Sequence, residues 1–168
     1  MFNPSPELLK KIGFNGQWVE MSLPTFDDVG LYAYVVRMAF SAIEENFKIG
    51  FDNRRLNTQL IGQVFGEAIL NAAEHGNKRD PSKKVQAAFW LGDNGVLFGV
   101  RDQGNFFTKQ STKELIESRT RLKSTRDWGS GPSGLGLDAV FEADDLFVST
   151  EENTLYLAVS APSMIMGK

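Results

Sequence analysis

The sequence of 168 residues contains no cysteine and only one histidine, His75. The lack of cysteine excludes disulfide bonds and zinc sites built from thiolates. A single histidine excludes metal sites that need several imidazole ligands from one chain. A cysteine-free composition is most simply explained by the cytoplasm, and we expect the protein to reside there.

The chain also lacks a long apolar run and an excess of basic residues. No stretch approaches the roughly 20 apolar residues that a membrane-spanning helix needs, and the first residues have no apolar core of the signal-peptide type. The net charge is −3, whereas a nucleic-acid-binding domain usually presents a basic face. The main basic run lies at residues 78–84 and is interpreted as a solvated loop. We therefore expect neither membrane insertion nor nucleic-acid binding.

The length favours a single domain. Residues 1–16 are interrupted by prolines and glycines, and we predict a loosely attached, disordered N-terminal arm there. Residues 17–160 form the predicted domain, and residues 161–168 form a short C-terminal tail.

Hydrophobic periodicity within the domain alternates between strand and helix patterns. The Asn-Gly pair at residues 94–95 lies between two alternating apolar runs, which is a strong hairpin signal. The predicted strands lie near residues 18–23, 85–91, 96–101, 145–149 and 154–160; the predicted helices lie near residues 29–47, 57–75 and 111–122, with another beginning near 134. Two hairpins in this order favour an α/β (α+β) two-layer sandwich, with a mixed, largely antiparallel sheet and helices on one face.

The most informative stretch is GEAILNAAEHGN at residues 66–77, inside the second predicted helix. Ile61, Phe65, Ala68, Ile69 and Ala72 form the apolar stripe of this helix. Glu67 and Asn71 are four residues apart, so in a helix they project from one face. This spacing places a carboxylate, which can act as a base, beside a neutral oxygen donor.

Two glycine-bearing segments follow this helix. The first is RDQGNFF at residues 101–107, and the second is GSGPSGLGL at residues 129–137. Glycines remove Cβ atoms and so allow backbone N–H groups to approach phosphate oxygens, and a helix N-terminus adds partial positive charge. The order of polar helix, Asp-x-Gly and Gly-rich loop indicates a nucleotide-binding site.

In this order the motifs resemble those of the GHKL ATPase superfamily, which includes gyrase, Hsp90-type chaperones, histidine kinases and MutL. The closer resemblance is to its anti-sigma-factor branch of serine/threonine kinases. The characteristic helix motif of that branch, the N-box, reads approximately Glu-Ala-x-x-Asn-Ala-x-x-His-Gly, and residues 67–76 match it throughout. The resemblance covers roughly residues 17–160 and implies a histidine-kinase-like ATPase fold.

The resemblance also implies a role for individual residues. Glu67 would be the general base, and Asn71 would hold Mg²⁺ through its amide oxygen. His75 would end the N-box helix near the phosphates, or would simply help to cap that helix. Asp102 would accept a hydrogen bond from the adenine amino group, and Gly104 would let the backbone pass close to the base.

The second glycine segment would bind the phosphates of ATP or ADP. The positions that the resemblance assigns to the nucleotide there are Gly129, Gly131, Ser133, Gly134, Leu135 and Gly136. The first glycine segment departs from the family pattern, since Phe106 occupies the second glycine of Asp-x-Gly-x-Gly.

The resemblance implies an ATP- and Mg²⁺-dependent protein serine/threonine kinase of the anti-sigma-factor type. Its substrate would be a small antagonist protein, a sigma factor would be a further partner, and the kinase would form a homodimer. Two alternatives stay open. The chain would be a nucleotide-binding regulatory module without phosphotransfer, or a stand-alone ATPase domain of the histidine-kinase type.

Overall fold

A computed structural model describes residues 1–25, 34, 37, 38, 41, 65, 66, 68–104, 146–151 and 153–160. Its elements are α1 (Pro6–Ile12), β1 (Phe14–Pro24), the π-helical turn η2 (Ala72–Gly76), β2 (Lys84–Gly92), β3 (Gly95–Arg101), β4 (Leu146–Glu151) and β5 (Thr154–Ser160). Residues 34, 37, 38 and 41 are helical, as predicted for the helix near 29–47. The helices predicted after residue 105 lie outside the described residues.

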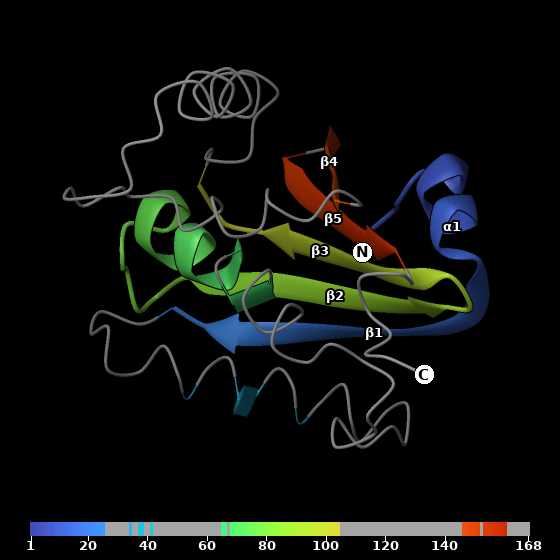
Figure 1. The fold of residues 1–168 in the computed structure, drawn as a ribbon. Coiled ribbons are helices and arrows are strands. Elements are labelled where there is room, and N and C mark those ends of the chain that lie inside the picture. The colour runs from blue at the N-terminus through green and yellow to red at the C-terminus, as the bar shows by residue number, and fades with distance from the viewer. Residues whose placement is uncertain are drawn as a thin grey trace, which may run out of the picture.

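The five strands form one antiparallel sheet in the order β1-β2-β3-β5-β4 (Figure 1). Both predicted hairpins are confirmed: β2 and β3 are joined at Asp93-Asn94, and β4 and β5 at residues 152–153. Asn153 adopts the left-handed conformation with φ 58°, which asparagine tolerates better than most residues. The turn residues thus fix the register of the sheet.

One face of the sheet packs against the N-box helix. The Phe65 ring stacks on Phe98 with centroids 4.8 Å apart, and Phe89 meets Phe98 edge-on at 5.0 Å. Phe65, Ala68, Ile69 and Ala72 are all buried, so the predicted apolar stripe is confirmed where the structure describes it. Ile61 lies outside the described residues.

The opposite face of the sheet is covered by the N-terminal segment, which we expected to be a disordered arm. That expectation is wrong. The α1 helix begins after Ser5, whose hydroxyl oxygen accepts a hydrogen bond from the Leu8 amide, and it ends at Gly13 with φ 63°. Proline is well tolerated in the first helical turn, so Pro6 starts this helix instead of breaking it.

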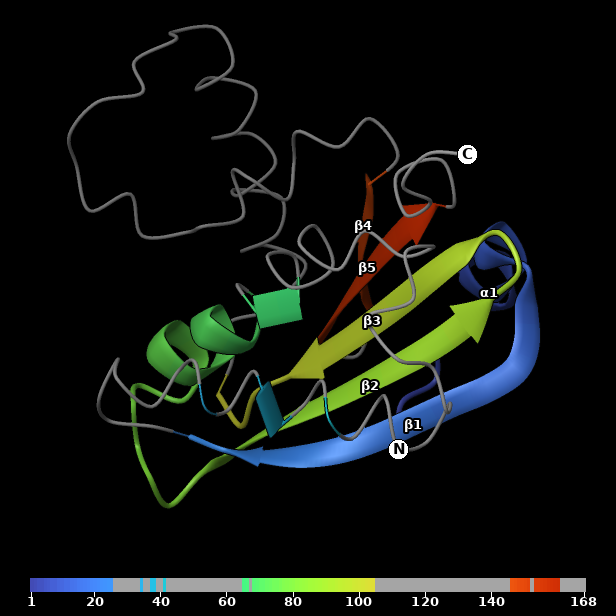
Figure 2. The same cartoon turned by 60° about the horizontal axis from the view of Figure 1, so that its bottom comes forward.

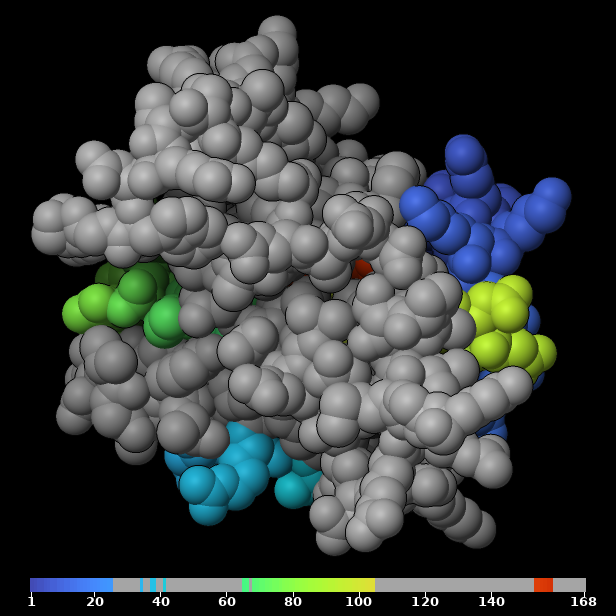
Figure 3. All heavy atoms as spheres, in the orientation of Figure 1, coloured from blue at the N-terminus to red at the C-terminus, as the bar shows by residue number. Residues whose placement is uncertain are grey.

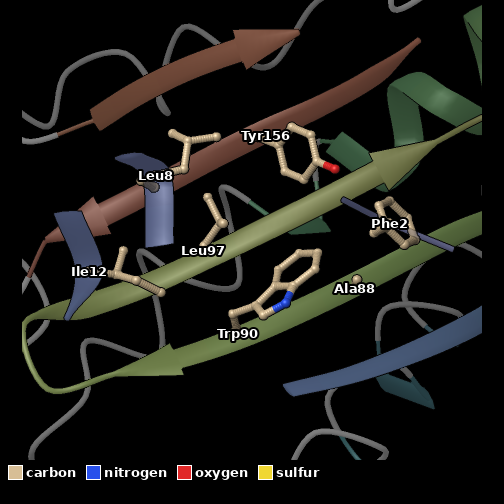
Figure 4. Packing of buried hydrophobic residues seen from close by; sticks show 8 residues of the cluster. Phe2, Leu8, Ile12, Ala88, Trp90, Leu97 and Tyr156 are labelled. Atoms are coloured by element: carbon tan, nitrogen blue, oxygen red, sulfur yellow. The ribbon is translucent and has the colours of Figure 1, made fainter. Parts of the chain in front are cut away.

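Phe2 anchors the N-terminal segment to the sheet (Figure 4). Its ring meets Trp90 and Tyr156 edge-on, with centroids 5.9 and 6.5 Å apart. Gly99 leaves room for this ring, because a Cβ at that position would lie 2.9 Å from a Phe2 ring atom. The Arg101 guanidinium also lies over the Phe2 ring, 5.1 Å from its centroid.

The end of α1 is also bonded to the turn between β2 and β3. The amides of Asp93 and Asn94 donate to the carbonyls of Gly13 and Ile12, at 3.0 and 2.9 Å. In the space-filling view, the blue N-terminal helix accordingly lies against the yellow-green turn (Figure 3). The segment is thus held at both ends, by the Phe2 ring and by backbone hydrogen bonds.

The predicted α/β class and largely antiparallel sheet are confirmed. The structure adds a second packed face, because α1 and the N-box helix cover opposite sides of the sheet (Figure 2). The domain limits at residues 17 and 160 stay predictions, and the tail at 161–168 lies outside the described residues. Within the described ranges, no helix has the length and apolar character to span a bilayer.

We expect Phe2→Ala to lower the free energy of unfolding by about 2–4 kcal/mol, because it empties a buried ring site. The measurement is urea denaturation followed by tryptophan fluorescence. Tyr34→Ala is the control, since it also removes an aromatic ring but from a side chain that is 59% exposed. Equal stability of the Phe2 variant and the wild-type protein would contradict the docked N-terminal segment.

Candidate nucleotide site

The N-box helix ends in a widened turn. The described residues 65, 66 and 68–71 are α-helical, and residues 72–76 form the π-helical turn η2. The Asn77 amide donates to the Ala72 carbonyl five residues earlier, at 2.8 Å. Short π-helical turns occur frequently at functional sites. The helix therefore continues to the predicted end of the N-box, but with a different hydrogen-bond pattern in its last turn.

Asn71 is placed at the start of this turn and is only 2% exposed. Its Nδ2 atom is buried and has no hydrogen-bond partner within the described ranges. A buried amide without partners is costly unless a ligand or a water satisfies it. This carboxamide therefore fits a role in binding a ligand, and its oxygen is of the donor type that Mg²⁺ prefers.

Asp102 and Gly104 follow the end of β3 and meet the end of the N-box. A Cβ at Gly76 would lie 2.3 Å from the Asp102 Cγ, and a Cβ at Gly104 would lie 2.1 Å from the Gly76 carbonyl oxygen. Both distances are too short for any side chain. The sequence predicted Gly76 as a helix stop and Gly104 as a point of close approach to a base; the structure shows that both glycines permit the same contact between two segments.

The conformation of Gly76 supports this role. Positive φ angles among the described glycines occur only at Gly13 and Gly16, so Gly76 does not end the helix through a left-handed conformation. Lys78 and Arg79 adopt that conformation instead, with φ 59° and 58°. The absence of a side chain, not backbone freedom, is what the site requires at Gly76.

The Asp102 carboxylate is buried, with 8% exposure, and Asp102 Oδ1 accepts a hydrogen bond from the Gly104 amide at 2.7 Å. This bond fixes the turn that carries both residues and orients the carboxylate. A buried carboxylate oriented in this way can recognise an exocyclic amine, because it only accepts hydrogen bonds when ionised.

Asn77 is a residue of this site that the sequence did not reveal. It is fully buried, and its Nδ2 donates to Thr25 Oγ1 at 2.7 Å and to the Lys84 carbonyl at 3.0 Å. Its Oδ1 accepts from the Gln103 amide at 2.8 Å. An asparagine directly after a helix is usually a solvated cap, so nothing in the sequence distinguished this one.

The basic loop next to the site is exposed at Lys78 and Arg79, as the sequence predicted. Arg79 forms an ion pair with Glu74. The hydroxyl and amide of Ser82 donate to Asp80 Oδ1, and these hydrogen bonds hold the pKa of Asp80 below its usual value. Local contacts thus account for the shape of this loop.

The remaining predicted site residues divide into two groups. His75 is half-buried in the last turn of the N-box, and its role towards phosphates stays a prediction. The others lie outside the described residues: Glu67, Gly129, Gly131, Ser133, Gly134, Leu135 and Gly136. In the described part of the chain, no three His, Asp or Glu residues form a metal-binding group.

The chain matches a known protein family. Residues 31–155 match the family model of the histidine kinase-like ATPase domain. The match includes the N-box, β2, β3 and β4, and it begins after α1 and β1. A search of curated proteins found no match.

We expect Gly76→Ala to destabilise the protein by about 1–3 kcal/mol, because the new methyl group must displace Asp102. The sign of the change in the free energy of unfolding distinguishes the close contact from an ordinary helical position. Alanine in place of glycine within a helix normally stabilises by roughly 1 kcal/mol. Denaturation by urea measures the difference, and a stabilised Gly76→Ala variant would contradict the close contact.

Proposed function

Because the chain belongs to the family of histidine kinase-like ATPase domains, we propose that it binds ATP or ADP together with Mg²⁺ at the end of the N-box. The observation that carries this proposal is the convergence of two buried polar groups on one place in the fold. Asn71 lies at the start of η2, and Asp102 contacts the end of the same turn. Together they provide a metal ligand and a reader of the base.

The Asp102 carboxylate would accept a hydrogen bond from the amino group of adenine. Guanine carries a carbonyl oxygen at the corresponding position, which would repel the carboxylate, so the site would select adenine. Bound Mg²⁺ would neutralise charge on the phosphates. The glycines and Ser133 of residues 129–137 would donate hydrogen bonds to the phosphate oxygens.

Phosphoryl transfer to a protein hydroxyl is the reaction that we propose for this site. Glu67 would take the proton from a serine or threonine of a partner protein as the hydroxyl oxygen bonds to the γ-phosphorus. The bond between that phosphorus and the β–γ bridging oxygen would break, and ADP would leave. The presence of both Glu67 and Asn71 in the N-box supports an active kinase.

The partner would be a small antagonist protein, as the resemblance to the anti-sigma-factor branch implies. The kinase would also bind a sigma factor, and it would act as a homodimer in the cytoplasm. A regulatory module without phosphotransfer is the second candidate, favoured by Phe106 at the position of a family glycine. A stand-alone ATPase domain of the histidine-kinase type is the third.

Thermal unfolding with ATP, ADP and GTP, each with and without Mg²⁺, tests nucleotide binding. We expect ATP at about a hundred times its dissociation constant to stabilise the protein by roughly 2.7 kcal/mol. Asp102→Asn should reduce ATP affinity about tenfold or more, because a hydrogen bond to a charged group is lost. The amide oxygen that this substitution introduces would still accept from the Gly104 amide, so the turn would be retained.

Asp93→Asn is the matched control for this measurement. It makes the same chemical change and the same change in charge, in the exposed turn between β2 and β3. Equal loss of affinity in both variants would remove Asp102 from base recognition. A wild-type protein that no nucleotide stabilises would refute the proposed function as a whole.

Glu67→Gln tests the phosphotransfer step. We expect it to abolish transfer from γ-labelled ATP to a co-purified partner protein while ATP binding is retained, since an amide cannot act as a base at neutral pH. Transfer at the wild-type rate would exclude Glu67 as the base. An acid-labile phosphate on the partner would indicate phosphohistidine and contradict the serine/threonine kinase.

A further inference from the structure

The Asn77 carboxamide joins three segments that are distant in the sequence. Its three hydrogen bonds reach Thr25 after β1, the Lys84 carbonyl at the start of β2, and the Gln103 amide after β3. Both N–H donors of its Nδ2 and its Oδ1 acceptor are used, and all three bonds are made by one planar group. At position 77 an ionised aspartate would provide no donor, and serine would be too short to reach all three partners. Alanine would form none of the three bonds.

Gln103 is held from two sides, and it lies between the two residues that face the N-box. Its backbone amide donates to Asn77, while its side-chain oxygen accepts from the Lys84 amide. Asp102 and Gly104 therefore flank a residue whose backbone is attached to the end of η2 and whose side chain is attached to the start of β2.

The attachment of Gln103 matters because the turn at residues 102–104 also contacts Gly76. The space between Gly76 and the turn at residues 102–104 is too small for one added carbon atom. Asn77 is the next residue after Gly76, so its bond to Gln103 closes the same contact from the adjacent position. A turn released from Asn77 would move away from the N-box and carry the Asp102 carboxylate with it.

We propose that Asn77 is a positioning residue for base recognition, which sets the place of the Asp102 carboxylate through the Gln103 amide without touching the nucleotide. This inference rests on the proposed function, since it assumes that Asp102 reads adenine. It assigns to Asn77 a part in the selection of ATP over GTP.

A residue with a merely structural role would give a different pattern of effects. Removal of Asn77 leaves buried partners unsatisfied and lowers stability in either case. Selectivity between two nucleotides of equal charge does not depend on global stability while the protein is folded. The ratio of the dissociation constants for GTP and ATP therefore separates positioning from stability.

The test compares Asn77→Ala, Thr25→Val and Gln103→Ala in the full chain. Thr25→Val removes one hydrogen bond of the Asn77 carboxamide but leaves its bond to Gln103, so it is the matched control. Gln103→Ala removes the side-chain bond to Lys84 and affects an exposed side chain. Binding of ATP and GTP is measured by titration below the melting temperature of each variant, and hydrogen exchange reports the amide of residue 103 without nucleotide.

We expect Asn77→Ala to lower the preference for ATP over GTP roughly tenfold and to speed exchange at the Gln103 amide. Thr25→Val should lower the melting temperature and leave both the preference and that amide unchanged. Gln103→Ala should lower the preference less, because it keeps the backbone amide bond to Asn77. If Asn77→Ala does not fold, Asn77→Leu takes its place in the same comparison, since leucine fills a similar space without a hydrogen-bond acceptor.

An unchanged preference in Asn77→Ala, with faster exchange at residue 103, would overturn the inference and leave the proposed function intact. An equal loss of preference in Thr25→Val would also overturn it, because the bond to Gln103 would then not be the cause. If the wild-type protein binds neither nucleotide, the proposed function fails and this inference fails with it.

Discussion

The contact between Gly76 and the turn at residues 102–104 is the constraint on which the candidate site depends. It brings the end of the N-box helix within van der Waals distance of the end of β3, with no room for a side chain at Gly76 or Gly104. The backbone on either side is arranged to allow this close contact. The π-helical turn shifts the last residues of the helix, and Asn77 then bonds the helix end to the turn.

The two faces of the sheet are linked at the strand end that carries the site. Arg101, the last residue of β3, bonds to Thr154 through its Nε at 2.8 Å and lies over the Phe2 ring. The next residue, Asp102, contacts the N-box on the other face. The N-terminal segment, which lies before the family match, thus packs against the strand that leads into Asp102.

Much of this arrangement was predictable because it depends on local patterns. Alternating apolar residues and the Asn-Gly pair predicted the hairpins, and the spacing of Phe65, Ile69 and Ala72 predicted the buried face of the N-box helix. The docking of Phe2 depends on the empty space above Gly99, and the role of Asn77 depends on partners in three other segments. Such contacts join distant segments, and no periodicity in the sequence records them.

The proposed function assigns base recognition and catalysis to different segments of the chain. Asp102 is buried and the Gly104 amide orients its carboxylate, so little reorganisation would be needed when adenine binds. The groups that would act on the γ-phosphate, Glu67 and residues 129–137, belong to other segments of the chain. A kinase and a regulatory module would therefore use the same base-reading half. They would differ in whether Glu67 meets a partner hydroxyl, so binding selectivity alone cannot decide between them, and the fate of the γ-phosphate can.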